Sequence, residues 1–119
     1  MKSTELRTGN LVSGLLPSDR DMYPCNFKVT AKMIYEYSIA DGDFIITGPV
    51  TLTEEWLVEF GFEVRKTIMS AAYEKNGFII YLSTTKNPNK FELGLDEDVV
   101  IEYVHTLQNL YYALKQEEL

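Results

Sequence analysis

The side chains with the widest chemical range lie close together near the C-terminus. His105, Gln108, Asn109 and Tyr112 stand at i, i+3, i+4 and i+7, the spacing that places side chains on one face of a helix. Such a face can bind a partner, or His105 can act there as a general base. The structural alternative is that His105 and Asn109 pair with backbone groups at the start of the helix. We favour this alternative because buried polar groups are usually paired for structural reasons.

The only cysteine that could act as a nucleophile is Cys25, and His105 is the only histidine that could activate it. Nothing in the sequence places the two together, and a free cysteine most often packs as a small hydrophobic side chain. The chain also lacks a phosphate-binding loop, a Rossmann glycine pattern and a G-x-S-x-G elbow. We therefore assign no catalytic residues and expect a non-enzymatic protein.

Two acidic clusters raise the question of a metal site. They comprise Asp41, Asp43, Asp96, Glu97 and Asp98. Asp41-Gly42-Asp43 lacks the twelve-residue ligand pattern of a calcium loop, in which six or more oxygens converge. One histidine and one cysteine are too few for zinc. Turn chemistry explains both clusters, so we expect no metal and no cofactor.

The chain is acidic, with a formal net charge of −7 over 119 residues. Residues 34–61 contain no Lys or Arg, and Lys115 is the only basic residue of 91–119. Proteins that bind nucleic acid cluster basic residues against phosphates, so direct nucleic-acid or anionic-membrane binding is disfavoured. The basic residues of 62–90 are read as a solvated strand face; they are Arg65, Lys66, Lys75, Lys86 and Lys90.

The start of the chain predicts a cytoplasmic location. Residues 1–10 contain no apolar signal segment, and no stretch reaches the eighteen or so apolar residues that a membrane span needs. A single cysteine cannot form an intramolecular disulfide, which agrees with a reducing compartment. The length favours a single domain, 1–119, with one core.

The N-terminal part, residues 1–48, reads as β-rich. Phe27, Val29 and Ala31 alternate with polar residues, which predicts a strand running from residue 27 to 39. The turn pair Asp41-Gly42 then predicts a hairpin of residues 30–40 with 43–47.

Residues 49–119 are predicted to form a helix, an antiparallel meander and a second helix. Thr53 predicts the N-cap of a short helix at 54–60, Leu52 and Leu57 have the spacing of a hydrophobic staple, and Gly61 suits the C′ position. Asn76-Gly77 between two strand-like runs predicts a type I′ hairpin.

The meander continues with a reversal at 87–89, a strand at 91–95, an exposed acidic loop at 96–98 and a strand at 99–103. A helix follows over 104–116, and its buried face is predicted to comprise Leu107, Leu110, Tyr111 and Leu114. The predicted fold is α+β: an N-terminal β-hairpin region, a short helix, an antiparallel meander and a C-terminal helix packed on the sheet.

Three segments carry a resemblance. LTEEWLVEFGF at 52–62, YVHTLQNLYYALKQEEL at 103–119 and ELRTGNLV at 5–12 resemble, in the same order, motifs of a family of small uncharacterised proteins. That family is found in gut bacteria and in their phages and prophages. The resemblance implies a mobile-element origin and an accessory role, and it assigns no site residues.

Three functions remain open. The favoured one is a non-enzymatic module that binds a protein partner or itself, since tyrosine is enriched at interfaces and the chain has eight. The tyrosines that motivate it are Tyr35, Tyr37, Tyr81, Tyr103, Tyr111 and Tyr112. The alternatives are an acidic decoy that occupies a DNA-binding protein, and a small enzyme that uses His105.

Overall fold

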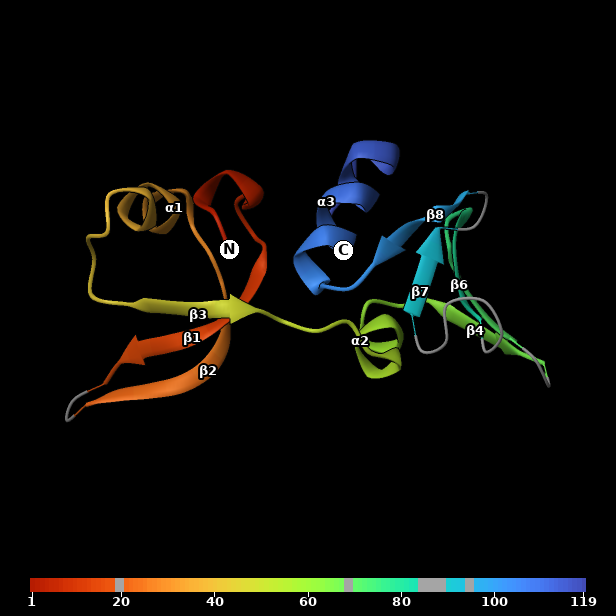
Figure 1. The fold of residues 1–119 in the computed structure, drawn as a ribbon, viewed down its shortest axis with the longest axis horizontal. Helices are drawn as coiled ribbons and strands as arrows, with labels where there is room; N and C mark the ends of the chain where they lie inside the picture. The colour runs from red at the N-terminus through yellow and green to blue at the C-terminus, as the bar shows by residue number, and fades with distance from the viewer. Residues whose placement is uncertain (19–20, 68–69, 84–89, 94–95) are drawn as a thin grey trace.

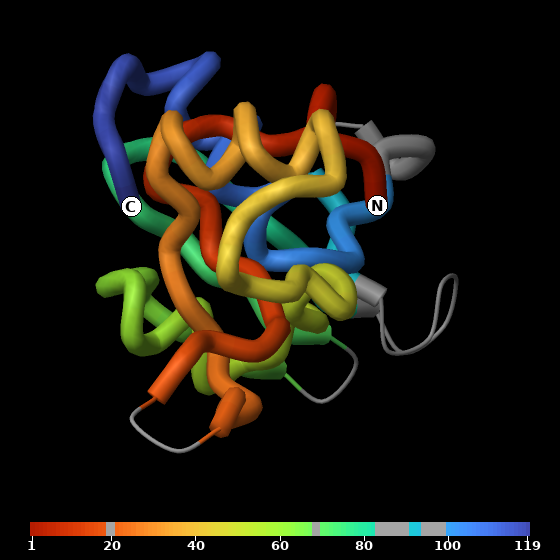
Figure 2. The backbone as a smooth tube through the Cα atoms, turned by 90° about the vertical axis from the view of Figure 1, so that its left-hand side faces the viewer, coloured from red at the N-terminus to blue at the C-terminus, as the bar shows by residue number. Residues whose placement is uncertain are grey.

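The computed structural model describes residues 1–18, 21–67, 70–83, 90–93 and 96–119. The protein is α+β, as the sequence predicts, and two antiparallel sheets lie along a long axis in a body of 49 × 28 × 23 Å (Figure 1). We call residues 1–49 the N-terminal lobe and residues 50–119 the C-terminal lobe. A view along the long axis shows the N-terminal lobe in front of the C-terminal lobe (Figure 2).

The N-terminal lobe contains a three-stranded sheet and two short helices. Its elements are the 3-10 helix η1 (Ser3–Glu5), β1 (Leu11–Pro17), β2 (Met22–Lys28), α1 (Ala31–Ser38) and β3 (Ile45–Pro49). The strand order is β2-β1-β3, with both pairs antiparallel. Val12 and Phe27, which are paired across β1 and β2, pack with Phe44 in a hydrophobic cluster of this lobe.

Helix α1 overturns the predicted hairpin of residues 30–40 with 43–47. The alternating pattern holds only as far as Val29, because Thr30 then caps a helix, its Oγ1 accepting a hydrogen bond from the Met33 backbone N–H at 3.2 Å. Met33, Ile34 and Tyr37 share a helical face and pack on the lobe's cluster. The strand after the Asp41-Gly42 turn is β3, and it pairs with β1 instead.

The C-terminal lobe is the predicted meander between two helices. Its elements are α2 (Glu54–Glu59), β4 (Glu63–Lys66), β5 (Ser70–Lys75), β6 (Phe78–Ser83), β7 (Lys90–Leu93), β8 (Asp96–Ile101) and α3 (Val104–Lys115). The strands follow each other in the order β4-β5-β6-β7-β8, all antiparallel. The β5–β6 turn has φ of 52° at Asn76 and 80° at Gly77, as a type I′ turn requires, so that prediction is confirmed.

One detail of the meander differs from the prediction, and two predicted features fall on residues that the structure does not describe. The acidic run 96–98 belongs to strand β8 and not to a loop. The predicted reversal at 87–89 and Leu95 lie outside the described residues.

Helix α2 ends as predicted. Gly61 has a φ of +89°, its N–H donates to the Val58 carbonyl at 3.0 Å, and the Phe62 N–H donates to the Leu57 carbonyl at 3.0 Å. These two bonds make a Schellman motif. Thr53 is the N-cap residue as predicted, but its hydroxyl accepts no backbone N–H. The staple partners Leu52 and Leu57 are both buried.

Helix α3 confirms the predicted terminal helix but corrects its buried face. Leu107 and Tyr111 are fully buried, and the Tyr111 ring packs on Phe78 with centroids 5.4 Å apart, which fixes the helix on the sheet. Leu110 is partly buried, whereas Leu114 is 58% exposed, because the last turn of the helix lies beyond the buried cluster. Val104, which the prediction did not include, is fully buried and belongs to the buried face of the helix.

The lobes are joined through α3, which contacts β1, and the segment that follows β3 is paired with the residues that lead into α3. Thr51 and Tyr103 form an isolated antiparallel bridge, and the Val104 N–H donates to the Val50 carbonyl at 2.8 Å. The length of the chain favours one core, but the buried apolar residues form two clusters, one in each lobe. Of the helices in the described part, none is long and apolar enough to cross a membrane.

Candidate functional site

The predicted polar face of α3 divides into two parts. Gln108, Asn109 and Tyr112 contact the segment 7–11 that leads into β1, whereas His105 lines a groove at the start of the helix.

Gln108 is an internal structural residue. Its side chain is buried, its Nε2 donates to the Gly9 carbonyl at 3.1 Å, and its Oε1 accepts from the Leu11 N–H at 2.8 Å. The amide of Asn10, which is also fully buried, approaches the same Oε1 at 3.5 Å. A carboxamide thus replaces the strand partner that the start of β1 lacks on this side, and at 2% exposure it does not face an external ligand.

Asn109 and Tyr112 hold the same segment from the next turns of the helix. Asn109 Oδ1 accepts from Asn10 Nδ2 at 2.8 Å and from Arg7 Nε at 3.2 Å, and its Nδ2 donates to the Glu5 carbonyl at 3.1 Å. The Arg7 guanidinium carbon lies 4.1 Å from the centre of the Tyr112 ring, a cation–π arrangement.

Arg7 completes this contact with the last residues of the chain. Its Nη2 donates to Glu118 Oε2 at 3.0 Å, and its Nη1 pairs with Glu118 Oε1. The hydrogen bond with Arg7 lowers the pKa of the Glu118 carboxyl, and the same bond raises the pKa of Arg7. The sequence pattern alone predicts no role for Arg7, Asn10 or Glu118.

These contacts bring together two segments that carry the resemblance described above. The opening segment 5–12 supplies Arg7 and Asn10, and the closing segment 103–119 supplies Gln108, Asn109 and Glu118. Motifs at opposite ends of the chain therefore meet at the junction of the lobes.

His105 differs from its neighbours on the helix. It is 6% exposed, its ring stacks on Tyr103 with centroids 5.9 Å apart, and within the described residues its buried Nδ1 has no hydrogen-bond partner. Burial lowers the pKa of the imidazole, and the nearby Glu5 carboxylate opposes that effect in part. His105 is therefore neutral at pH 7, with one polar atom unsatisfied. The predicted pairing of His105 with backbone groups is not found among the described residues.

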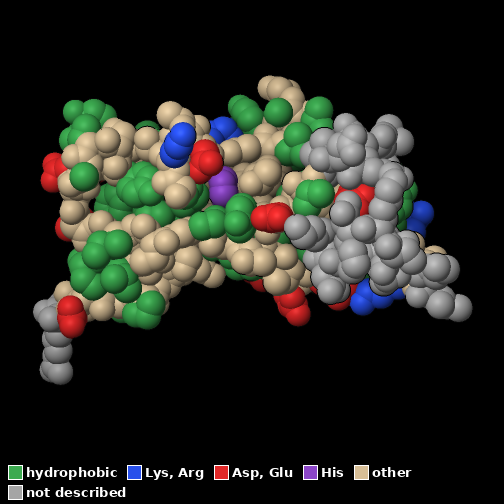
Figure 3. All heavy atoms as spheres, in the orientation of Figure 1, with side chains coloured by type: hydrophobic (Ala, Val, Ile, Leu, Met, Phe, Trp, Pro, Cys, Tyr) green, Lys and Arg blue, Asp and Glu red, His purple; other side chains and the backbone are tan. Residues whose placement is uncertain are grey.

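His105 is visible at the surface between the two lobes, as the single purple side chain of Figure 3. Two adjoining hollows of about 370 and 460 Å³ meet there, and both are lined by Glu5, His105 and Thr106. We call this continuous depression the waist groove. A general base acts on a substrate through a positioned acid or nucleophile, and the groove offers no cysteine or lysine beside His105 among the residues that line it.

A second polar cluster, which the sequence did not suggest, lies between α2 and the β4–β5 edge. Lys66 Nζ is 2.8 Å from Glu54 Oε1, and the buried Tyr73 hydroxyl donates to that same oxygen at 3.3 Å. Burial, followed by the charge of Glu54, raises the pKa of Tyr73 to about 12, so this phenol stays protonated at neutral pH. The three groups satisfy one another, which is the behaviour of a structural cluster.

The other candidate residues from the sequence do not come together into a site within the described structure. Cys25 is partly buried against the hydrophobic cluster of the N-terminal lobe, on a strand that does not line the waist groove, so the structure does not pair it with His105. Among the residues that the structure describes, no three His, Cys, Asp or Glu side chains converge as metal ligands. Of the basic residues of 62–90, Arg65 and Lys66 pair with Glu74 and Glu54.

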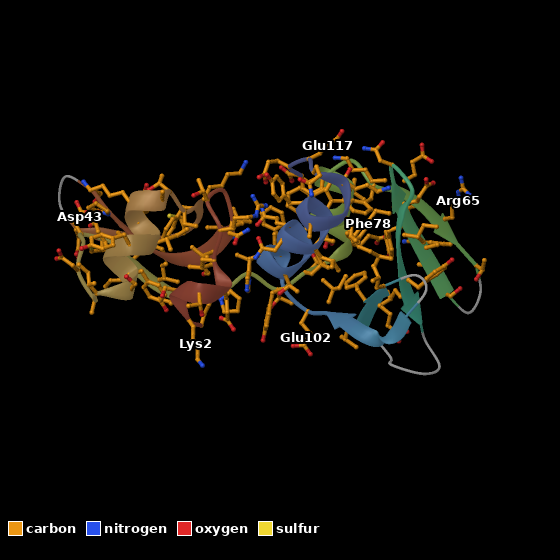
Figure 4. All side chains as sticks on the ribbon, turned by 90° about the horizontal axis from the view of Figure 1, so that it is seen from above. Lys2, Asp43, Arg65, Phe78, Glu102 and Glu117 are labelled. Carbon is orange, nitrogen blue, oxygen red and sulfur yellow. The ribbon has the colours of Figure 1, made fainter. Side chains whose placement is uncertain are left out.

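The described carboxylates do not share one face. Figure 4 shows Asp43 at the far end of the N-terminal lobe, whereas Glu102 and Glu117 lie on opposite sides of the C-terminal lobe. A decoy for a DNA-binding groove needs a continuous row of carboxylates, and these three do not form part of one.

Comparison of the chain with protein-family models, with curated proteins and with solved structures finds no match.

Proposed function

We propose that this protein is a non-enzymatic interaction module of the cytoplasm, an accessory protein of phage or prophage origin that binds a protein partner or a second copy of itself. The origin rests on the resemblance of the three sequence segments. The interaction rests on one structural observation: among the described residues, one face of the N-terminal sheet carries apolar side chains that belong to neither hydrophobic cluster.

The pairing of the strands defines that face. Val12 and Leu16 point to the side of α1 and pack in the lobe's hydrophobic cluster, so Leu15 points to the opposite side. Leu15 is paired with Pro24 of β2 and with Ile45 of β3, which places three apolar side chains in a row across the sheet. Pro17 and Met22 are paired one step further along the same face.

None of these five residues belongs to either hydrophobic cluster; Pro17, Pro24 and Ile45 are exposed, Ile45 by 49%, and Leu15 and Met22 are half-buried. We call them the open face; its members are Leu15, Pro17, Met22, Pro24 and Ile45. A contiguous exposed apolar patch on a small protein is typical of an interaction surface.

Exposed tyrosines of the same lobe support the proposal. Tyr23 is 46% exposed and Tyr35 is 65% exposed. Aromatic rings contribute large contact areas at protein interfaces at a low entropic cost. The polar clusters around Gln108 and around Glu54 pair internally and not around a reacting centre, which favours binding over catalysis.

The test compares Ile45→Lys with a matched control, Val58→Lys, which changes a residue of similar exposure (55%) on α2 of the other lobe. Both variants and the unchanged protein are used as bait in a bacterial lysate, and their masses are measured by light scattering. The proposal predicts that a partner, or the dimer mass, is retained by the unchanged protein and by Val58→Lys and lost with Ile45→Lys. A monomeric mass together with the same recovered proteins for all three baits contradicts it.

A further inference from the structure

Carboxylates border the open face at the end where β1 passes into β2. Asp21 directly precedes Met22 at this end of the sheet. Asp43 precedes Ile45 by two positions, and Phe44 between them is buried in the hydrophobic cluster of the lobe. Figure 4 shows Asp43 at the far end of the N-terminal lobe. Both carboxylates are exposed, and neither forms an ion pair with a described residue.

The described basic residues of the N-terminal lobe do not neutralise these carboxylates. Arg7 and Lys32 are in ion pairs with glutamates. Lys28 lies at the opposite end of the sheet, beside the start of β1, and Lys2 lies closer to the C-terminal lobe (Figure 4). The formal charges of residues 19 and 20, which are outside the described part, sum to zero. This end of the open face is therefore acidic.

The opposite face of the same sheet indicates what kind of segment fits. There α1 lies over the strands and packs apolar side chains on the lobe's cluster (Figure 1). We call Leu15, Pro24 and Ile45 the apolar row; it crosses the three adjacent strands. Two strand spacings are about 10 Å, which is close to the diameter of a helix with its side chains. A second helix therefore fits the apolar row as α1 fits the other face, and sheets are commonly covered by helices on both faces.

A second copy of the chain is a poor occupant of this surface. In a symmetric dimer both subunits use the same patch, so covering one apolar row with the other brings Asp21 and Asp43 of both copies around one axis. Like charges that meet at an interface lower the affinity. The net charge of −7 opposes self-association in the same sense.

We propose that the open face binds a basic amphipathic helix of a partner protein. The apolar side chains of this helix lie on the apolar row, and its Lys or Arg side chains face Asp21 and Asp43. The inference rests on the proposed function, since it names the class of partner that the open face binds. The apolar row supplies the buried contact, and the opposite charges steer the helix and fix its orientation. Exposed ion pairs are screened by salt, so binding is expected to weaken as the salt concentration rises.

Two synthetic peptides test the proposal with the full chain. Each has about 15 residues, a length at which an amphipathic sequence can form a helix on a surface. Both carry leucine at i, i+3, i+4 and i+7, and the remaining positions are all lysine in one peptide and all glutamate in the other. Fluorescence anisotropy follows the binding of the labelled peptides. We expect the lysine peptide to bind with a Kd of about 100 µM or tighter, and the glutamate peptide to bind at least about tenfold more weakly.

Variants of the chain locate the binding. The double variant Asp21→Asn, Asp43→Asn removes two charges but keeps the Asp21 oxygen that accepts the next backbone N–H at 2.8 Å, and we expect it to bind the lysine peptide at least about fivefold more weakly. The matched control Glu59→Gln, Glu117→Gln removes the same charge from exposed positions of the C-terminal lobe, and its effect should stay within about twofold. Ile45→Lys should abolish saturable binding.

The outcomes distinguish this inference from the proposed function. Equal binding of the two peptides, equal effects of the two double variants, or no binding of either peptide overturns the basic helix as the occupant. A dimer mass that Ile45→Lys abolishes also overturns it, and leaves the open face standing as an interface between copies. If Ile45→Lys binds the lysine peptide as tightly as the unchanged protein does, the open face is not the binding surface and both proposals fail.

Discussion

Leu11 and Val12 are consecutive residues of β1, and their side chains enter different hydrophobic clusters. Leu11 packs in the cluster of the C-terminal lobe and Val12 in that of the N-terminal lobe, and both are buried. Successive side chains of a strand point to opposite faces, so a single strand contributes to both lobes at the point where they meet. The two clusters are therefore coupled through the backbone of β1 and not through a flexible linker.

This coupling predicts that the lobes unfold together. Trp56, the only tryptophan, packs against the C-terminal cluster and reports on that lobe, whereas far-UV circular dichroism reports on both. Val12→Ala removes two buried methyl groups from the other lobe and should lower the free energy of unfolding by about 2 kcal/mol. Denaturant titrations should give the same shifted midpoint by both probes. An unchanged Trp56 transition beside a shifted dichroism transition would show that the lobes unfold separately.

Gln108 should be among the most sensitive polar positions. Gln108→Ala leaves the buried Leu11 N–H and the Gly9 carbonyl without partners, and we expect a loss of about 2–5 kcal/mol in the free energy of unfolding. Gln116→Ala is the matched control, because that exposed side chain donates only to the Ala113 carbonyl; its effect should stay within about 0.5 kcal/mol. Similar losses for the two variants would contradict the structural role of Gln108.

Two glycines of the N-terminal sheet should respond in opposite ways to alanine. A Cβ on Gly14 would lie 2.0 Å from the Ile45 carbonyl oxygen, so Gly14→Ala requires β1 and β3 to separate at their irregular pairing. We expect a loss of more than about 2 kcal/mol. A Cβ on Gly48 meets nothing within 4 Å, so Gly48→Ala should be neutral or slightly stabilising. Thermal unfolding of the two variants compares them directly, and equal midpoints would rule out the close approach at Gly14.

Glu118 should make stability depend on pH in the acidic range. Its folded pKa is lowered below the ordinary value of 4.5, mainly by the hydrogen bond from Arg7, so the contribution is present above that value and is lost as the pH falls through the folded pKa. The pair is solvent-exposed, with 54% exposure on the Glu118 side, so the contribution is below about 1 kcal/mol. Unfolding of Glu118→Gln and of the unchanged protein, measured from pH 7 downward, should differ at pH 7 and converge in acid. A difference that grows as the pH falls would have the wrong sign.

The C-terminal lobe was largely predictable because its signals are local. The Asn76-Gly77 turn and the Gly61 cap each depend on residues close together in the chain, and the structure contains both. The predicted staple residues Leu52 and Leu57 are buried in the same cluster. The predicted strand from residue 27 to 39 failed because two periodicities overlap there. The alternation ends at Val29, and the helical spacing that begins after Thr30 matches α1.

The candidate site was predictable only on its helical side. Helical spacing correctly places Gln108, Asn109 and Tyr112 on neighbouring positions of α3, but it contains no information about what packs against them. Their partners Arg7 and Asn10 lie about a hundred positions away in the chain, and only the folded structure brings them together. The error at Leu114 has a similar cause, because periodicity does not indicate where the facing sheet ends.

The central claim is that the open face of the N-terminal sheet binds a partner, and site-specific photo-crosslinking tests it most directly. A benzophenone amino acid is placed at Ile45 or, as the control, at Val58, and the protein is irradiated in a bacterial host. The account predicts a discrete adduct, either a second copy or one partner protein, from Ile45 and not from Val58. Equal adducts from both positions, or no adduct from Ile45, would contradict it.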